Sequence, residues 1–223
     1  MNTINKTSRL LGLAFLFQFV TSFCSGVFLR PTWLVPESIR ETMLKIANNP
    51  GSMQVTIFLD MLTALGVIFL GAVLFVTLRK QNEPLALTAL GFYILEGALL
   101  ACSRTEAFSL LRFSQEYAVE ASAPIQMMAQ IASESMDFVG SSLSMLAFCA
   151  GAIIFYSLLD RSRVVPRWLS LWGLIAVFPC LVGTLAAIFG FQLPFAIYLP
   201  YVPFEFVIGI WILVKGVREP QTV

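Results

Sequence analysis

Long apolar stretches with almost no charged residues recur along the whole chain and constrain its fold more than any other feature. Windows of about 19 residues identify six of them, each long enough to cross the apolar slab of a bilayer, which is about 30 Å thick. The predicted spans cover residues 10–29, 53–78, 85–109, 128–159, 168–189 and 195–214. We therefore expect an all-α polytopic membrane protein, a bundle of six transmembrane helices.

Composition argues against a soluble fold. Hydrophobic residues make up 58% of the 223 residues and charged residues only 12%, whereas a soluble domain has about 25% charged residues to cover its core. No long linker or low-complexity tract separates the spans, so residues 1–223 are expected to form a single transmembrane domain. Fourteen basic and thirteen acidic residues nearly cancel, which gives no argument for a nucleic-acid partner. The expected partner is the lipid bilayer.

Basic residues in the connections predict the orientation. Nine of the fourteen fall on one side of the predicted bundle, at both termini and in the connections around 79–80 and 161–167. The positive-inside rule places that side in the cytoplasm, and an even number of spans agrees with both termini lying there. The first run is long enough to span and no small-x-small cleavage site follows it, so we expect a helix rather than a signal peptide.

Two segments on the predicted outer side are longer than turns. Residues 36–48 carry apolar side chains at helical spacing and a Glu41–Lys45 pair, which predicts an amphipathic helix on the outer face. This helix is either a lid over the bundle or a connector packed on the headgroups. Residues 113–126 are acidic, and we expect them to be irregular or loosely helical.

Short sequence motifs at both ends and in one turn are similar to a known family. They are Ser8 to Gly12, Arg163 to Leu169, Leu171 to Leu174, Pro203 to Glu205, and Gly209 to Gly216. With them the chain resembles the bacterial domain-of-unknown-function family 4386, small multi-helix membrane proteins, over essentially its whole length. The resemblance implies a bacterial inner-membrane protein and brings no activity. In such proteins an arginine often precedes the acid of the third helix by a turn; here Tyr93 stands before Glu96, so that carboxylate lacks a local partner.

Acidic residues inside the spans are the informative feature for function. A charge at the bilayer centre costs about 2.5–3.5 kcal/mol on insertion scales, so each acid needs a reason to be there. Counting at 1.5 Å per residue from the nearer end of each apolar run puts Asp60, Glu96 and Glu205 about 10–12 Å below the outer surface. Asp137, with Glu134 nearby, falls in the outer part of the fourth span. We expect these carboxylates to share one level.

Polar residues share the helix faces that carry these acids. Gln18, Ser22 and Ser25 align in the first span, and Glu96 aligns with Ser103 in the third. We predict an outward-opening polar cavity between the first, second, third, fourth and sixth spans. Its predicted ligand-binding residues are Asp60, Glu96, Asp137, Glu205, Gln18 and Ser103.

Structural explanations exist for the same residues. Buried acids often hydrogen-bond across helices and only hold them together. Glu205 follows Pro203, so a helix that starts there would place its carboxylate in the favourable first turn. The run of small residues around Asp137 suits close helix packing. Arg104 is expected to reach the outer interface; the alternative is a counter-ion to Glu106 or to an acid of the cavity.

The residue inventory excludes most catalytic chemistry. The chain has no histidine, and its four cysteines have no CxxC spacing, so we expect no metal site, no cofactor and no catalytic residue. Phosphate-binding loops and nucleophile elbows are also absent from the sequence. An enzyme is therefore not the expected function.

Three functions remain open. The first is binding or transport of a proton, a cation or a cationic or polar small molecule in the carboxylate-lined cavity. The second is a non-catalytic accessory or sensory module that works through helix contacts. The third is a lipid-modifying intramembrane enzyme that uses paired carboxylates.

Overall fold

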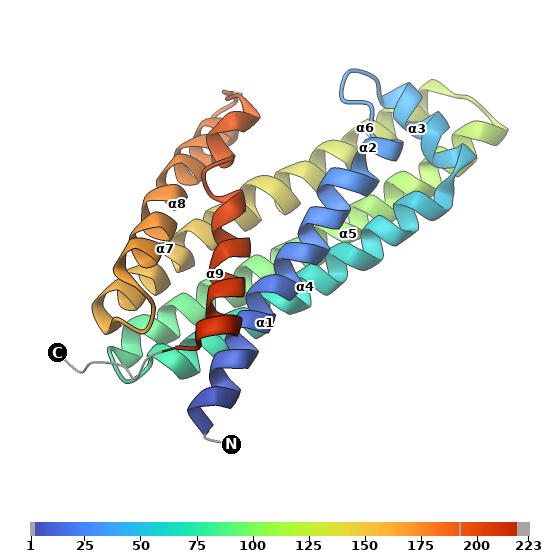
Figure 1. Cartoon of the computed structure of the whole chain (residues 1–223). Helices are drawn as coiled ribbons and strands as arrows, with labels where there is room; N and C mark the ends of the chain where they lie inside the picture. The colour runs from blue at the N-terminus through green and yellow to red at the C-terminus, as the bar shows by residue number, and fades with distance from the viewer. Residues whose placement is uncertain (1–2, 192, 218–223) are drawn as a thin grey trace.

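The computed structural model describes residues 3–191 and 193–217, and these contain helices and connections but no strand (Figure 1). Six of the helical stretches are long and apolar enough to cross a membrane, which confirms the predicted all-α bundle. The stretches run over Ser8–Trp33, Pro50–Leu78, Glu83–Val119, Ala123–Ser162, Arg167–Ile188 and Ala196–Lys215.

Three of the six spans are built from more than one helical element. The first joins α1 (Thr3–Phe23), η1 (Cys24–Leu29) and α2 (Arg30–Trp33), and the fourth joins α6 (Ala123–Asp137), η2 (Phe138–Leu143) and α7 (Ser144–Ser162). The second, third and fifth are α4 (Pro50–Leu78), α5 (Glu83–Val119) and α8 (Arg167–Ile188). In the sixth, η3 (Phe195–Tyr198) precedes α9 (Val202–Lys215). The remaining helix is α3 (Ile39–Asn48).

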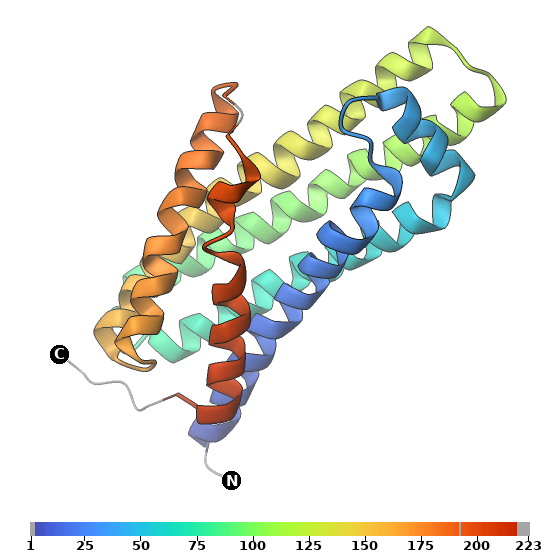
Figure 2. The ribbon, with the colours of Figure 1, turned by 45° about the horizontal axis from the view of Figure 1, so that its top comes forward.

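The bundle has two parts. The first and fourth spans lie with α4 and α5 in a long, tilted arm, and α3 packs across the far end of this arm (Figures 1 and 2). Helices α8 and α9 stand against the other half and diverge from the arm towards the top of the view. At the opposite end α9 finishes beside the start of α1, where the backbone N–H of Val217 donates to Ser8 Oγ at 2.6 Å. We call these the α3 end and the terminal end.

The segment 113–126 was predicted wrongly. Helix α5 continues to Val119 and α6 begins at Ala123, so only three residues separate them. The reason is that Ala107, Leu110, Ser114 and Tyr117 recur at helical spacing and are buried against neighbouring helices. At 1.5 Å per residue, the 37 residues of α5 measure about 55 Å, which is well beyond the apolar thickness of a bilayer.

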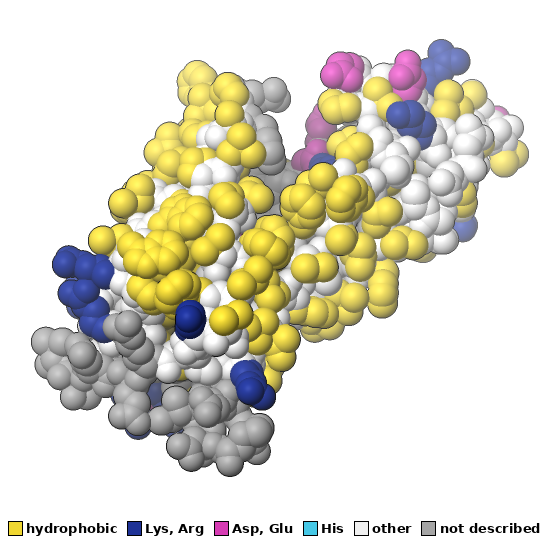
Figure 3. Space-filling model, viewed as in Figure 1, with side chains coloured by type: hydrophobic (Ala, Val, Ile, Leu, Met, Phe, Trp, Pro, Cys, Tyr) yellow, Lys and Arg dark blue, Asp and Glu magenta, His cyan; other side chains and the backbone are white. Residues whose placement is uncertain are grey.

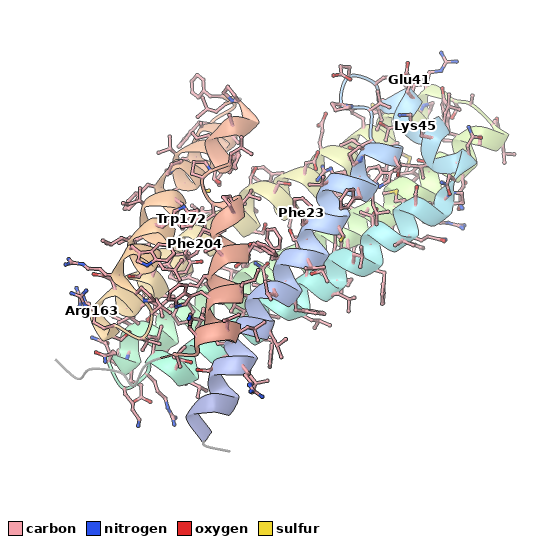
Figure 4. The ribbon with its side chains drawn as sticks, in the orientation of Figure 1. Phe23, Glu41, Lys45, Arg163, Trp172 and Phe204 are labelled. Atoms are coloured by element: carbon pink, nitrogen blue, oxygen red, sulfur yellow. The ribbon has the colours of Figure 1, made fainter. Side chains whose placement is uncertain are left out.

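The predicted amphipathic helix over residues 36–48 corresponds to α3, which begins after Ser38. The Ser38 hydroxyl caps it by accepting from the backbone N–H of Glu41 at 3.2 Å. Its apolar face packs on the protein, since Met43 and Ile46 are fully buried, while Glu41 and Lys45 point away from the bundle (Figure 4). Its position on the outer membrane face stays a prediction.

Two apolar cores hold the bundle together. The larger one fills the terminal half and contains Tyr93, Phe155, Tyr156 and Phe204. The smaller one lies at the α3 end around Trp33, with residues of α3, α5 and α6. Outside, hydrophobic side chains cover most of the face in Figure 3, and many are more than half exposed, including Phe58, Phe108, Ile175 and Phe178. An apolar exterior of this extent suits contact with lipid.

Irregular backbone occurs at three places in the spans. Segments η1 and η2 are π-helical turns, a rare geometry that often marks functional sites. The sixth span breaks between η3 and α9, and Glu205 lies in the first turn of α9, as predicted from Pro203. The π-helical turns were not foreseen, because a one-residue widening leaves no periodicity signal in runs this apolar.

Candidate functional site: two polar pockets

The polar residues of the spans gather in two pockets rather than in one cavity. The larger, which we call the arginine pocket, has a volume of about 140 Å³. Its lining comes from the first span, α4, α5 and the fourth span: Ser22, Ser25, Gly26, Arg30, Trp33, Thr56, Asp60, Leu100, Arg104, Met136, Gly140 and Ser141. The smaller, the glutamate pocket, measures about 10 Å³ and is lined by Gln18, Val67, Leu70, Tyr93, Glu96, Phe148 and Glu205.

A buried ion pair between Arg104 and Asp60 dominates the arginine pocket. The two side chains are 10% and 15% exposed, so the charges compensate each other with little water present. The Asp60 carboxylate also accepts from the Ser25 hydroxyl. Arg104 donates to the hydroxyl of Ser103, from Nη2 at 2.8 Å, and that hydroxyl donates to the carbonyl of Leu100. Ser103 therefore orients the guanidinium.

The expectation that Arg104 reaches the outer interface was wrong, and the alternative of a counter-ion was correct. Asp60 on α4 lies at the same height and faces α5, so the guanidinium pairs with it instead of extending to water. An unpaired arginine and an unpaired aspartate buried at this level would each carry the full cost of desolvation.

A second ion pair joins Arg30 and Asp137 on the more open side of the pocket. Their side chains are 31% and 46% exposed, so water screens this pair more than the first. Glu134 lies outside the pocket: it is exposed and accepts from Gln130 Nε2 one turn earlier on α6. Asp60 and Asp137 are therefore each neutralised by an arginine.

Glycine and π-helical geometry make room for the arginine pocket. Ser25 and Gly26 belong to η1, and Gly140 and Ser141 belong to η2, so both π-helical turns contribute to its wall. A Cβ added at Gly140 would lie 2.5 Å from Ser103 Oγ and 2.8 Å from Arg104 Nη2. The missing side chain therefore leaves the space through which the guanidinium reaches Asp60.

Glu205 is the hydrogen-bonded member of the glutamate pocket. Its Oε1 accepts from Gln18 Nε2 at 2.6 Å and from the Tyr201 hydroxyl at 2.9 Å. The Tyr201 oxygen lies 2.7 Å from that of Tyr156, and because the Tyr201 hydrogen is donated to Glu205, the Tyr156 hydroxyl donates to Tyr201. The break before α9 places Tyr201 and Glu205 one turn apart on the same face.

Glu96 is the member without a partner. Its Oε2 is buried and forms no hydrogen bond with the described residues, and the same holds for the hydroxyl of Tyr93 one turn earlier on α5. None of the ion pairs among the described residues involves Glu96 or Glu205. A buried oxygen of an acid without a donor is costly, because its interactions with water are lost and nothing replaces them.

Three separate hydrogen bonds follow one another along the first span between the two pockets. Ser25 contacts Asp60 in the arginine pocket, and Gln18 contacts Glu205 in the glutamate pocket. Between them Thr63 Oγ1 on α4 donates to Thr21 Oγ1 on α1 at 2.8 Å. Residues 18, 21 and 25 follow one another at three- and four-residue spacing across α1 and the start of η1, so one face of the first span carries all three contacts. We call this row the polar seam.

The predicted site residues therefore separate into two groups at different heights. Asp60 lines the arginine pocket, while Ser103 and Asp137 lie outside its lining and contact its arginines, and Glu96, Glu205 and Gln18 line the glutamate pocket. Glu96 precedes Arg104 by eight residues on α5, which is about 12 Å along the helix. Sequence reasoning placed them at one level because it assumed a 30 Å helix, whereas the 29 residues of α4 measure about 44 Å.

Several residues of the pockets were not foreseen. Arg30, Tyr156 and Tyr201 were not singled out as site residues from the sequence, and Tyr93 was noted only as the residue that precedes Glu96 by one turn. A hint was present for Arg104, since a basic residue flanked by apolar turns at the height of an acid predicts an ion pair. Among the described residues no group of three or more His, Cys, Asp and Glu side chains could hold a metal ion.

The comparison with protein families assigns the chain. The family described as a domain of unknown function, DUF4386, matches residues 10–216, which is nearly the full length. The chain belongs to the DUF4386 family. No curated protein and no solved structure matches it. Membership of DUF4386 confirms the resemblance found in the sequence, and the description of the family names no ligand or reaction.

Residues of the motifs that resemble DUF4386 pack against one another in the terminal half. Arg163 ends α7 with φ of 54°, and Val164 and Val165 after it are buried. Further along, Trp172 packs edge-to-face on Phe204 with ring centroids 5.9 Å apart, and the two lie side by side between α8 and α9 (Figure 4). In this DUF4386 protein these motifs stabilise the fold around α8 and α9.

Proposed function

We propose that the chain binds a proton in the glutamate pocket and exchanges it through the polar seam with the α3 side of the membrane. Proton binding, with transport as its extension, is the function that the site supports best. The observation that carries the proposal is Glu96, whose Oε2 is buried without a partner in the same small pocket as Glu205.

Charge is the first argument. Two ionised carboxylates in one pocket repel each other, and no arginine or lysine of the described residues pairs with either. Isolated charges inside a bilayer cost about 2.5–3.5 kcal/mol each even on the lower of the available scales. A bound proton removes one of the charges and turns one carboxylate oxygen into a hydrogen-bond donor.

Size is the second argument. A cavity of about 10 Å³ holds one water at most, because a single water needs roughly 10–15 Å³. A polar small molecule or a hydrated cation does not fit. Asp60 and Asp137 offer no site for a lone cation, because each is already paired with an arginine that a lone cation would leave uncompensated.

Connectivity is the third argument. The Tyr201 hydroxyl donates to Glu205 and contacts Tyr156, so a proton can move between these groups through short hydrogen bonds. On the other side, Gln18, Thr21, Thr63 and Ser25 extend towards Asp60. Water in the arginine pocket could complete this path.

Orientation gives the proposal a direction. The excess of basic residues at the termini and in the connections on that side supports a cytoplasmic terminal end in a bacterial inner membrane. The arginine pocket then lies in the outer half and the glutamate pocket nearer the cytoplasm. Asp and Glu side chains seen in Figure 3 lie at the α3 end, and Lys and Arg side chains lie at both ends.

Proton flux into proteoliposomes tests the proposal. The full chain is reconstituted with a pH-sensitive dye inside, and an applied potential drives protons across. We expect flux with the unchanged chain, and little or none with Glu96→Gln or Glu205→Gln. Glu134→Gln is the matched control, because Glu134 is exposed and outside both pockets. Equal flux in all of these proteins would refute transport, and retained cellular function with both glutamates neutralised would favour the accessory module.

A further inference from the structure

The arginine pocket has features that proton binding does not require. It is more than ten times larger than the glutamate pocket and contains two guanidinium groups and one carboxylate in its lining. At about 140 Å³ it can hold on the order of ten waters, or a small molecule, but not a drug-sized ligand.

Its opening is defined by the exposure of its lining. Ser22, Gly26 and Ser141 are exposed, whereas Trp33 and Thr56 are buried and joined by a hydrogen bond from the indole Nε1 at 3.0 Å. The pocket is therefore open between η1 and η2 and closed towards α4. Two π-helical turns at the mouth of one pocket match the usual association of this geometry with ligand sites.

The charges of the pocket select the ligand. Arg104 is paired with Asp60, and Arg30 with Asp137, so the four groups together are neutral. A singly charged ligand that replaced one partner of a pair would leave the other charge buried and uncompensated, which is strongly unfavourable. A ligand with one anionic and one cationic group can replace both partners at once.

We propose that the arginine pocket binds a small zwitterionic group, its anion on the guanidinium of Arg104 or Arg30 and its ammonium on Asp60 or Asp137. The serine hydroxyls at 22, 25 and 141 supply further donors and acceptors, and guanidinium groups bind phosphate or carboxylate oxygens through two parallel hydrogen bonds. The group can come from a free zwitterion or from the headgroup of a lipid such as phosphatidylethanolamine. This site is separate from the glutamate pocket, where the proton is proposed to bind.

Calorimetry on the purified full chain tests the proposal. The probes are glycerophosphoethanolamine and β-alanine as free zwitterions, with ethanolamine, dimethyl phosphate and propionate as singly charged halves. We expect heat of binding for a zwitterion and at least about tenfold weaker binding for every half, because each half leaves a charge unpaired. Binding of a half as tightly as the zwitterion would overturn the proposal.

A lipid arm identifies the source. Native mass spectrometry after delipidation compares phosphatidylethanolamine with phosphatidylglycerol. Selective retention of phosphatidylethanolamine, without binding of the free probes, assigns the site to the headgroup. No binding of either free zwitterion and no lipid selectivity would refute the site.

Variants locate the binding. Ser141→Phe fills the mouth from an exposed position and leaves both ion pairs in place, so it should weaken binding about tenfold or more while the chain stays folded. Asp60→Asn with Arg104→Gln removes one pair without leaving a lone charge and should have the same effect. Glu96→Gln should not change binding, which separates this test from that of the proton site. Unchanged affinity in both pocket variants would contradict the proposal.

Discussion

Gln18 and Glu205, which are 187 residues apart in the sequence, are joined by a hydrogen bond of 2.6 Å between the first and the last span. Two glycines allow this contact. A Cβ at Gly12 would lie 2.8 Å from Leu213 Cγ, and one at Gly209 would lie 2.8 Å from Leu16 Cγ, so α1 and α9 approach more closely than larger residues permit. The close approach brings the buried amide of Gln18 within reach of the half-buried carboxyl group of Glu205.

Removal of Gln18 should destabilise the protein. Gln18→Ala takes one of two donors from Glu205 Oε1, and a lost hydrogen bond to such a group costs about 1–3 kcal/mol. The free energy of unfolding in mixed detergent micelles measures the effect. Gln54→Ala is the matched control, since Gln54 is exposed on α4. Equal effects of the two substitutions would show that the contact does not contribute.

The two ion pairs of the arginine pocket should differ in energy. Arg104→Gln leaves Asp60 uncompensated in a site where both side chains are at most 15% exposed, and breaking such a pair costs about 3–5 kcal/mol. Arg30→Gln should cost only about 0–1 kcal/mol, because that pair is partly in water.

A double-mutant cycle measures the interaction energy between Arg104 and Asp60 apart from their other contacts. Asp60→Asn added to Arg104→Gln should recover a large part of the lost stability, since no charge is then left unpaired. Additive losses from the two substitutions would contradict the assignment of Arg104 as the counter-ion of Asp60.

Glycine substitutions should distinguish tight from open helix faces. Gly173→Ala would place a Cβ 2.3 Å from Phe204 Cζ, and overpacking of this kind costs about 1–3 kcal/mol. Gly91→Ala meets nothing within 4 Å and should stabilise α5 by about 0.5–1 kcal/mol. Thermal unfolding of the two variants tests this difference. An equal loss of stability in Gly173→Ala and Gly91→Ala would show that the contact of Gly173 with Phe204 is not tight.

Orientation can be measured with fusions. Green fluorescent protein fused after Val223 should fluoresce, and alkaline phosphatase at the same position should be inactive, if the terminal end is cytoplasmic. The same reporters inserted after Glu120, in the connection between α5 and α6, should give the reverse result. Active phosphatase at Val223 would invert the topology and the direction of proton movement.

Much of the fold can be predicted from the sequence, because membrane spans are recognised by the length and apolar composition of the stretch. The first-turn position of Glu205 was expected for a helix that starts at Pro203, and α9 starts one residue earlier, at Val202. The extension of α5 to Val119 was missed because its last turns are partly polar; burial of Leu110 and Tyr117 against a neighbouring helix sustains them.

The sequence predicted the acids of the two pockets but not the partner of each acid. Acids in apolar runs pointed to Asp60, Glu96 and Glu205, since their desolvation needs compensation. Which group compensates each acid depends on helix register and on the η1 and η2 turns, and neither leaves a sequence signal. For this reason Arg104 was expected at the outer interface, with pairing to an acid of the cavity only as the alternative. For the same reason Glu96 and Asp60 were predicted to share one cavity.

Infrared spectroscopy of the glutamate pocket tests the central claim most directly. The carbonyl stretch of a protonated carboxyl group is resolved from that of a carboxylate, so a pH titration of the reconstituted chain reports whether a buried glutamate holds a proton. We predict a protonated-carboxyl band near neutral pH that is lost or shifted in Glu96→Gln and Glu205→Gln and unchanged in Glu134→Gln. A spectrum with no such band at neutral pH, or a band indifferent to both pocket substitutions, would contradict proton binding between Glu96 and Glu205.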